Sequence, residues 1–129
     1  LIGFYDDNGI TIDGRTELTY SDDAAQRFES YGWHVQRVDD GNDLEAIDQA
    51  VRAAKEETER PSLIILRTII GWGSPNRADT SKAHGEPLGK EEIALTKRAY
   101  GWPSDEPFHV PAESLDAWRA AGRKAAEHH

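Results

Sequence analysis

Three short apolar runs along the chain predict β-strands, and two amphipathic segments between them predict helices. The runs cover residues 1–5, 33–38 and 62–70, and the last contains four consecutive apolar side chains, as a central strand of a parallel sheet does. Residues 24–31 and 44–54 carry apolar side chains every three or four positions, the spacing of one helix face. This alternation predicts an α/β fold, a parallel sheet flanked by helices, whose first run forms a buried strand.

Capping and turn residues mark the ends of the two helices. Residues 21–23, Ser-Asp-Asp, suit the start of the first helix, and Gly32 suits the position just after its end. Asn42 or Asp43 caps the second helix, which ends before Pro61. These boundaries agree with the hydrophobic pattern.

The other segments are less regular. Residues 9–21 are rich in turn formers and predict no regular element. Residues 71–89 are rich in Gly, Pro and polar side chains, and a loop of that length in a compact domain is usually functional or disordered. Residues 93–100 and 115–125 predict amphipathic helices. The link between these helices contains Pro103, Pro107 and Pro111.

The composition narrows the possible partners. A chain of 129 residues fits one domain, and its formal charge of −9 argues against nucleic acid or an anionic membrane as a partner. No apolar stretch is long enough to span a membrane. The absence of cysteine excludes disulfides and thiolate metal sites, and it is compatible with the reducing cytoplasm where we expect the protein. We interpret residues 128–129, His-His, as the stub of an expression tag.

The first apolar run ends in Asp6, Asp7 and Asn8, followed by Gly9. Ligands of open α/β sheets bind at the carboxyl ends of the strands, and Asp and Asn supply hard oxygen ligands for Mg²⁺ or Ca²⁺. The same residues also favour simple turns. A second apolar segment, residues 10–12, follows directly and favours a site. Because the run begins at residue 1, we expect further sequence upstream.

Two other kinds of acidic site fit the sequence less well. In an EF-hand loop, alignment of Gly9 or Gly14 with the invariant glycine puts Arg15 or Tyr20 where a bidentate glutamate must stand. A phospho-accepting receiver domain needs a helix directly after its paired acids and an Asp after a later strand. Here residues 10–14 follow the acids, and a predicted helix occupies the middle of the chain.

Among the histidines of the sequence, His84 is the clearest candidate for a chemical role. A lone histidine in a loop is usually only solvated, but its imidazole can donate to a phosphate or act as an acid or base near neutral pH. His34 on a predicted strand and His109 beside prolines suit structural roles. Trp72, between two glycines, suits a residue that braces the loop.

Four segments in a fixed order carry a family resemblance. They are residues 5–14 (YDDNGITIDG), 31–33 (YGW), 69–76 (IIGWGSPN) and 84–89 (HGEPLG). Together they resemble transketolase, a thiamine-diphosphate enzyme. The resemblance implies that residues 1–129 form the C-terminal portion of its diphosphate-binding (PP-type) domain. The implied reaction is transfer of a two-carbon ketol unit between sugar phosphates in the pentose phosphate pathway, with thiamine diphosphate and Mg²⁺ as cofactors.

The resemblance also implies roles for particular residues. The metal motif of this superfamily ends in an Asn that matches Asn8, so the Asn8 side chain and the Ile10 backbone carbonyl are the implied Mg²⁺ ligands. His84 matches a histidine that reaches both diphosphate and substrate, which makes it the implied catalytic residue. Ile12 and Ile70 match apolar positions near the cofactor.

The implied fold and site are incomplete in this sequence. The Gly-Asp-Gly half of the metal motif would precede residue 1, and the pyrimidine-binding domain with its catalytic glutamate is absent. The remaining transketolase segments, a second subunit and sugar-phosphate substrates are the implied partners. We expect the isolated chain to be inactive, and loss of a neighbouring strand would leave residues 1–5 as exposed apolar surface. The alternative is a non-catalytic split subunit or remnant that acts by association with other chains.

Overall fold

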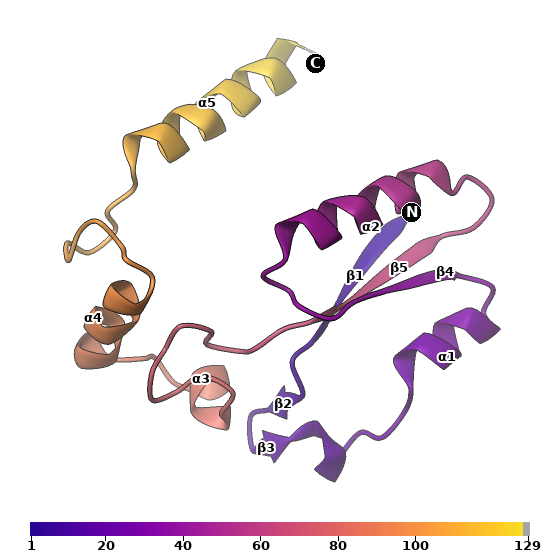
Figure 1. The fold of residues 1–129 in the computed structure, drawn as a ribbon, viewed down its shortest axis with the longest axis horizontal. Coiled ribbons are helices and arrows are strands. Elements are labelled where there is room, and N and C mark those ends of the chain that lie inside the picture. Colours follow the sequence, from indigo (N-terminus) through magenta and orange to yellow (C-terminus); the bar gives the residue numbers. More distant parts are fainter. Residues whose placement is uncertain (128–129) are drawn as a thin grey trace.

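A three-stranded parallel sheet forms the centre of the computed structural model (Figure 1). The structure describes residues 1–127, so residues 128–129, interpreted above as a tag stub, lie outside it. The strands are β1 (Ile2–Asp7), β5 (Ser62–Arg67) and β4 (His34–Val38), in the spatial order β1-β5-β4. Both strand pairs are parallel, which confirms the predicted α/β fold.

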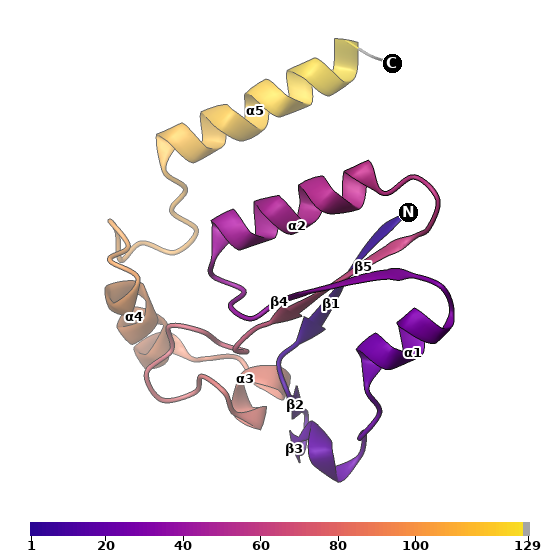
Figure 2. The ribbon, with the colours of Figure 1, turned by 45° about the vertical axis from the view of Figure 1, so that its right-hand side comes forward.

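Two helices cover opposite faces of this sheet. Helices α1 (Ala24–Ser30) and α2 (Leu44–Glu56) lie on different sides of it in both ribbon views (Figures 1 and 2). Successive side chains of a strand point to opposite faces, so the central strand β5 supplies both cores. Leu63 and Ile65 pack on the α1 side, and Ile64 packs against the buried alanines of α2.

An aspartate caps the start of each of these helices, within the predicted segment 21–23 for α1 and at one of the two predicted positions, 42 or 43, for α2. A carboxylate oxygen of Asp23 accepts a hydrogen bond from the Gln26 backbone N–H at 3.1 Å. Asp43 does the same for Ala46 at 3.0 Å, so Asp43 rather than Asn42 caps α2. Such bonds satisfy amide donors that the first helical turn leaves without partners.

Strand β1 lies at the edge of the sheet, so the prediction that residues 1–5 form a buried strand is wrong. Strand β1 pairs with β5 on one side, and its side chains alternate between exposed and half-buried. Leu1 is 89% exposed and Phe4 is 54% exposed. The apolar run reflects a hydrophobic surface at a sheet edge, as expected if a neighbouring strand is missing.

Two segments that we expected to be irregular contain short elements. Strands β2 (Ile10–Thr11) and β3 (Gly14–Arg15) form a small antiparallel hairpin, followed by the 3-10 helix η1 (Thr16–Leu18). The long loop after β5 contains helix α3 (Ser81–Gly85). These elements are too short to produce a periodic pattern of apolar residues.

The last two helices are longer than the sequence pattern indicated. Helices α4 (Lys90–Ala99) and α5 (Ala112–Glu127) each begin three residues before their expected starts at 93 and 115. Helix α5 lies apart from the sheet in both views, and its Trp118 is 79% exposed (Figures 1 and 2). Within residues 1–127, no helix has the length and apolar character needed to cross a membrane.

Candidate functional site

The carboxyl ends of β1 and β5 bring two candidate segments to one edge of the sheet. The register pairs Asp7 with Arg67, so the chain leaves both strands at the same level. The carbonyl of Asp7 accepts hydrogen bonds from the Thr68 backbone N–H at 3.3 Å and from Arg67 Nη1 at 2.8 Å. These bonds hold the segment that begins with Asn8 beside the one that leads to Ile70, where ligands of parallel sheets bind.

A tight turn fixes the side chain of Asn8. Its Oδ1 accepts a hydrogen bond from the Ile10 backbone N–H at 2.9 Å, a local bond that Asn forms readily. Gly9 between them has a φ of +70°, and a Cβ at this position would lie 3.3 Å from Arg67 Nη1. Ile10 is only 7% exposed, so its burial anchors the turn.

Helix α3 brings His84 to the hairpin that follows this turn. The helix packs against β2, and a Cβ at Gly85 would lie 3.0 Å from Ile12 Cγ1. The side chains of Ile12 and His84 are both exposed, and therefore available to a ligand. Among residues 1–127, no hydrogen bond links His84 to Asn8.

The loop after β5 folds back on its own beginning, which adds Ile70 to this group. The Ile70 carbonyl accepts a hydrogen bond from the Asp79 backbone N–H at 3.0 Å. Gly71 has a φ of +64°, and a Cβ there would come within 2.8 Å of the Ala83 Cβ. Three of the five predicted site residues, Ile12, Ile70 and His84, therefore belong to segments in direct contact, and Asn8 and Ile10 lie at the base of the hairpin.

A buried carboxylate anchors the beginning of this loop to α4. Glu92 is 8% exposed and accepts hydrogen bonds from the hydroxyl of Ser74 and from the backbone and side-chain nitrogens of Asn76, the latter two at 2.8 and 2.9 Å. The Ser74 hydroxyl, followed by the Asn76 donors, holds the pKa of Glu92 below its ordinary value. Glu92 is thus a charged anchor at neutral pH.

An ion pair ties the middle of the loop to the hairpin. The Arg15 guanidinium donates two hydrogen bonds to the Asp79 carboxylate, at 3.0 and 2.6 Å, across 64 residues of sequence. Asp79 has a φ of +58°, a left-handed conformation that is uncommon outside glycine. The pair therefore joins a constrained loop residue to β3.

An acidic cavity of about 440 Å³ opens beside the turn at Asn8. Its lining includes Asn8 and Tyr5, and burial, followed by the neighbouring charge of Asp7, raises the pKa of Tyr5, so its phenol stays neutral. Arg37 is the one basic side chain that lines the cavity within the described residues. The lining carboxylates are Asp6, Asp7, Asp22 and Asp23. Asp22 pairs with Arg27 and Asp23 pairs with Arg37, so Asp6 and Asp7 carry most of the negative charge of the cavity. A diphosphate beside them would need an accompanying cation. Ile12, Ile70 and His84 do not line this cavity.

The oxygens near the turn fit one side of a Mg²⁺ site. The Asn8 Oδ1 accepts one hydrogen bond and keeps a second lone pair, and the Ile10 carbonyl is another neutral hard oxygen. No three His, Cys, Asp or Glu side chains within residues 1–127 are arranged to hold a metal. Mg²⁺ takes about six oxygens and commonly receives several from phosphate and water, so the donors fit a shared site.

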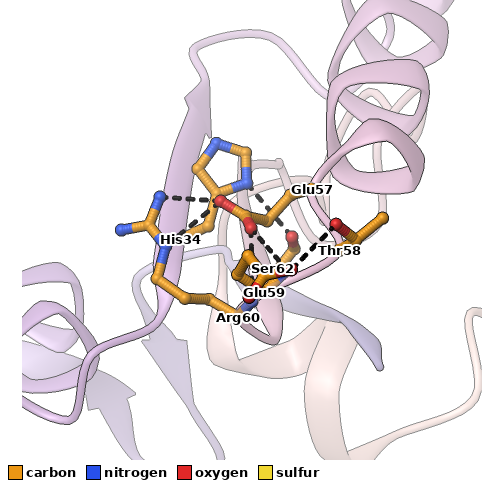
Figure 3. Close-up of polar contacts among 6 residues, drawn as sticks. All are labelled: His34, Glu57, Thr58, Glu59, Arg60 and Ser62. Atoms are coloured by element: carbon orange, nitrogen blue, oxygen red, sulfur yellow. Dashed lines mark hydrogen bonds and ion pairs between the residues drawn. The ribbon is translucent and has the colours of Figure 1, made fainter.

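A second histidine pairs with a serine at the opposite end of the sheet (Figure 3). His34 Nδ1 lies 3.1 Å from Ser62 Oγ, and Glu57 is bound nearby by Arg60. Ser62 is fully buried, so its hydroxyl is inaccessible to a substrate. The pair joins the first residues of β4 and β5 and is structural, as we expected for His34.

Sequence reasoning missed the residues that hold the loop in place. Arg15 and Asp79 are far apart in sequence, and no local pattern connects them. Glu92 stands in a polar helix start, where a carboxylate is normally solvated. Thr96, four residues later on the same face of α4, is also buried and donates to the Glu92 carbonyl at 2.8 Å, but a Glu and a Thr at this spacing give no sign of burial in the sequence.

Comparison with known proteins identifies relatives of the entire chain. The family model described as "Transketolase, thiamine diphosphate binding domain" matches residues 1–129. Transketolase 2 of Escherichia coli (strain K12) is 51% identical over an alignment of 129 residues that covers 98% of this chain and 19% of that protein. Transketolase of Geobacillus stearothermophilus is 48% identical over 120 residues, 93% of this chain and 18% of that protein.

Solved structures agree with these sequence relatives. A Pichia stipitis transketolase in complex with sedoheptulose 7-phosphate has a TM-score of 0.90 and 39% identity, covering 99% of this chain and 19% of that one. The transketolase of Leishmania mexicana has a TM-score of 0.88 and 34% identity, covering 98% and 20%. The chain thus spans about a fifth of the length of these relatives. It belongs to the transketolase family, in the thiamine diphosphate binding domain.

Proposed function

We propose that this chain forms the diphosphate side of the cofactor site of a transketolase, which transfers a two-carbon ketol unit between sugar phosphates. The observation that carries the proposal is the meeting of the Asn8 turn, the Ile70 segment and the His84 helix at one sheet edge in a chain of this family. Thiamine diphosphate and Mg²⁺ are the proposed cofactors. A cytoplasmic place in the pentose phosphate pathway is part of the same proposal.

Each candidate residue has a specific role in this proposal. The Asn8 side chain and the Ile10 carbonyl would hold Mg²⁺, which neutralises the diphosphate against an acidic cavity. Ile12 and Ile70 would provide apolar contacts that exclude water from the cofactor. The exposed imidazole of His84 would donate to the diphosphate or substrate and hold or release a proton near neutral pH. The cofactor itself, when bound, supplies the carbanion chemistry of ketol transfer.

The proposal divides the site between this chain and other parts of a transketolase. Two neutral oxygens are too few for Mg²⁺, so the Asp of the upstream Gly-Asp-Gly segment would complete the metal site. The pyrimidine-binding domain and a second subunit would supply the remaining walls and the catalytic glutamate. We therefore expect weak cofactor binding and no ketol transfer by residues 1–129 alone. A separate non-catalytic subunit is not favoured, because the relatives are transketolases about five times as long.

Segment replacement in a relative tests the proposed function. Residues 1–127 would replace the matching segment of Escherichia coli transketolase 2, to which this chain is 51% identical. We expect this chimera to transfer ketol units with thiamine diphosphate and Mg²⁺, and His84→Ala to lower its kcat/KM by about 10²–10⁴-fold, the usual contribution of an acid–base group. The measurement is steady-state ketol transfer between sugar phosphates.

Histidine substitution at a structural position provides the matched control. His109→Ala removes an imidazole that lies next to Trp102 rather than in the candidate site, and it should leave kcat/KM unchanged. A folded, cofactor-loaded chimera without ketol transfer would contradict the proposal. Equal activity of the chimera and its His84→Ala variant would exclude the role given to His84.

A further inference from the structure

We propose that Arg15 and Asp79 are positioning residues. Their ion pair holds the loop that carries His84 against the β2–β3 hairpin, which contains Ile12. Their side chains form two hydrogen bonds, at 3.0 and 2.6 Å, between β3 and the loop after β5. Two parallel bonds of a guanidinium fix the direction of approach as well as the distance. Any importance of this ion pair for cofactor binding rests on the proposed function. Its role in holding the loop does not depend on that function.

The backbone conformation of Asp79 supports a specific role for its carboxylate. Its φ of +58° is costly for a residue with a side chain, although Asp and Asn tolerate it better than most others. The same residue donates its backbone N–H to the Ile70 carbonyl at 3.0 Å. Asp79 therefore connects the strained turn of the loop to both the Ile70 segment and the Arg15 side chain.

The ion pair lies next to the closest contact between the two segments. Thr80 follows Asp79 directly and precedes α3, whose Gly85 lies against Ile12. Arg15 in β3 pairs with Ile10 in β2, so the guanidinium is carried by the same hairpin as Ile12. Opening the ion pair would let α3, and His84 with it, move away from that hairpin.

A second ion pair in the same loop does not have this effect. Arg77 and Glu86 pair at 3.0 Å, but both residues belong to the loop and its short helix. This bond can stabilise the loop internally without attaching it to the hairpin. Glu92, in contrast, fixes the start of the loop to α4, at Ser74 and Asn76. Arg15 and Asp79 thus provide a distinct attachment on the side of the candidate site.

Nuclear magnetic resonance of the 129-residue chain, without any cofactor, tests the proposal. The two readouts are the nuclear Overhauser effect between the Ile12 δ-methyl and the Gly85 α-protons, and amide exchange over residues 79–85. Asp79→Asn keeps the side-chain volume and tolerates the left-handed backbone, but it removes the charge. We expect it to weaken the Ile12–Gly85 signal and to speed exchange by about two- to fivefold, the range for an exposed ion pair.

Graded variants and salt separate positioning from general stability. Arg15→Gln should match Asp79→Asn, and Arg15→Lys should lie between it and the unmodified chain, since lysine keeps the charge but not the two parallel bonds. Salt at 1 M should reproduce these changes in the unmodified chain, because it screens exposed charges. Glu86→Gln should leave the Ile12–Gly85 signal unchanged, and amide exchange in β5 should be the same in all variants.

The result that would overturn the proposal is equally specific. An unchanged Ile12–Gly85 signal and unchanged exchange in both Asp79→Asn and Arg15→Gln would show that the ion pair does not hold the loop. An equal loss in Glu86→Gln would show that any ion pair in the loop has this effect. Neither outcome depends on thiamine diphosphate, so failure here leaves the proposed function to its own test.

Discussion

Glu92 shows how one buried carboxylate can order a long polar loop. A loop with few apolar side chains gains little from burial, so hydrogen bonds to a fixed partner must hold it. Glu92 lies on α4 and accepts bonds from Ser74 and from both nitrogens of Asn76. Loss of one partner would leave buried polar groups unsatisfied, which makes each of these residues sensitive to substitution.

The lowered pKa of Glu92 predicts how the loop responds to acid. Its folded-state pKa lies below the ordinary value of 4.5, so ionised Glu92 favours the folded loop above that pH. As the pH falls from 4.5 through the lower folded-state pKa, this contribution should disappear. Amide exchange at Ser74 and Asn76, measured from pH 6 to pH 3, should therefore accelerate relative to β5 beyond the intrinsic pH dependence.

A Glu92→Gln variant isolates this carboxylate from the other acids. It should show faster exchange at Asn76 already at pH 6, because an amide group cannot accept all three bonds. In this variant, amide exchange at Asn76 relative to β5 should then change little with pH. Gln in place of the exposed Glu91 is the matched control and should behave like the unmodified chain. The same acid response in the chain and in Glu92→Gln would contradict the assignment.

Gly73 is the glycine whose replacement should cost the most. It has a φ of +82°, and a Cβ there would overlap the Tyr100 ring, which stacks on Trp72. Gly73→Ala should lower the free energy of unfolding by about 1–3 kcal/mol, because strain and overlap add. Gly122→Ala, in α5 with open space around it, should be neutral or raise that free energy by up to about 1 kcal/mol. Equal thermal denaturation midpoints of the two variants would show that the Tyr100 side chain can move aside without loss of stability.

At the scale of elements, the sheet and its two flanking helices were predictable because their signals are local. The apolar run at 63–66 identifies the central strand, and Asp23 and Asp43 identify the helix starts. The hairpin and α3 were not predictable, because elements of two to five residues carry no periodicity. An apolar run also cannot tell a buried strand from an edge strand, which is why the burial of residues 1–5 was misjudged.

The candidate site was only partly predictable for a related reason. Motif resemblance suggested Asn8 and His84, but the attachments between their segments come from side chains distant in sequence. The Arg15–Asp79 pair depends on the loop folding back, and Glu92 depends on α4 packing beside that loop. Neither contact leaves a trace in spacing or composition. Only tertiary packing brings Arg15 to Asp79 and Glu92 to the loop.

The exposed edge of β1 makes a testable difference to self-association. Apolar edge strands pair readily with other chains, and Phe4 is 54% exposed there. Phe4→Lys should reduce concentration-dependent association in sedimentation velocity, while its free energy of unfolding changes by no more than about 0.5 kcal/mol. Leu44→Lys alters an exposed residue on α2 and should leave association unchanged. Equal association of the unmodified chain, Phe4→Lys and Leu44→Lys would argue against β1 as the surface through which the chains associate.

At the scale of the whole molecule, the chain combines a packed sheet core with the diphosphate side of the proposed cofactor site. The core is buried between α1 and α2, whereas Asn8 and Ile10 offer only neutral oxygens beside four carboxylates. An acidic surface cannot hold a diphosphate without a cation, and two oxygens cannot hold that cation firmly. In the proposed site, further ligands would therefore come from the rest of a transketolase.

Calorimetric titration with thiamine diphosphate and Mg²⁺ tests whether the metal site is shared between this chain and the rest of a transketolase. The chimera with Escherichia coli transketolase 2 should bind the cofactor, Asn8→Ala should weaken its Mg²⁺ affinity by about 10–100-fold, and residues 1–129 alone should bind only weakly. Asn42→Ala, an exposed asparagine in another turn, is the control and should bind normally. Unchanged Mg²⁺ affinity in the Asn8→Ala chimera, or micromolar binding by the isolated chain that Asn8→Ala abolishes, would contradict the shared site.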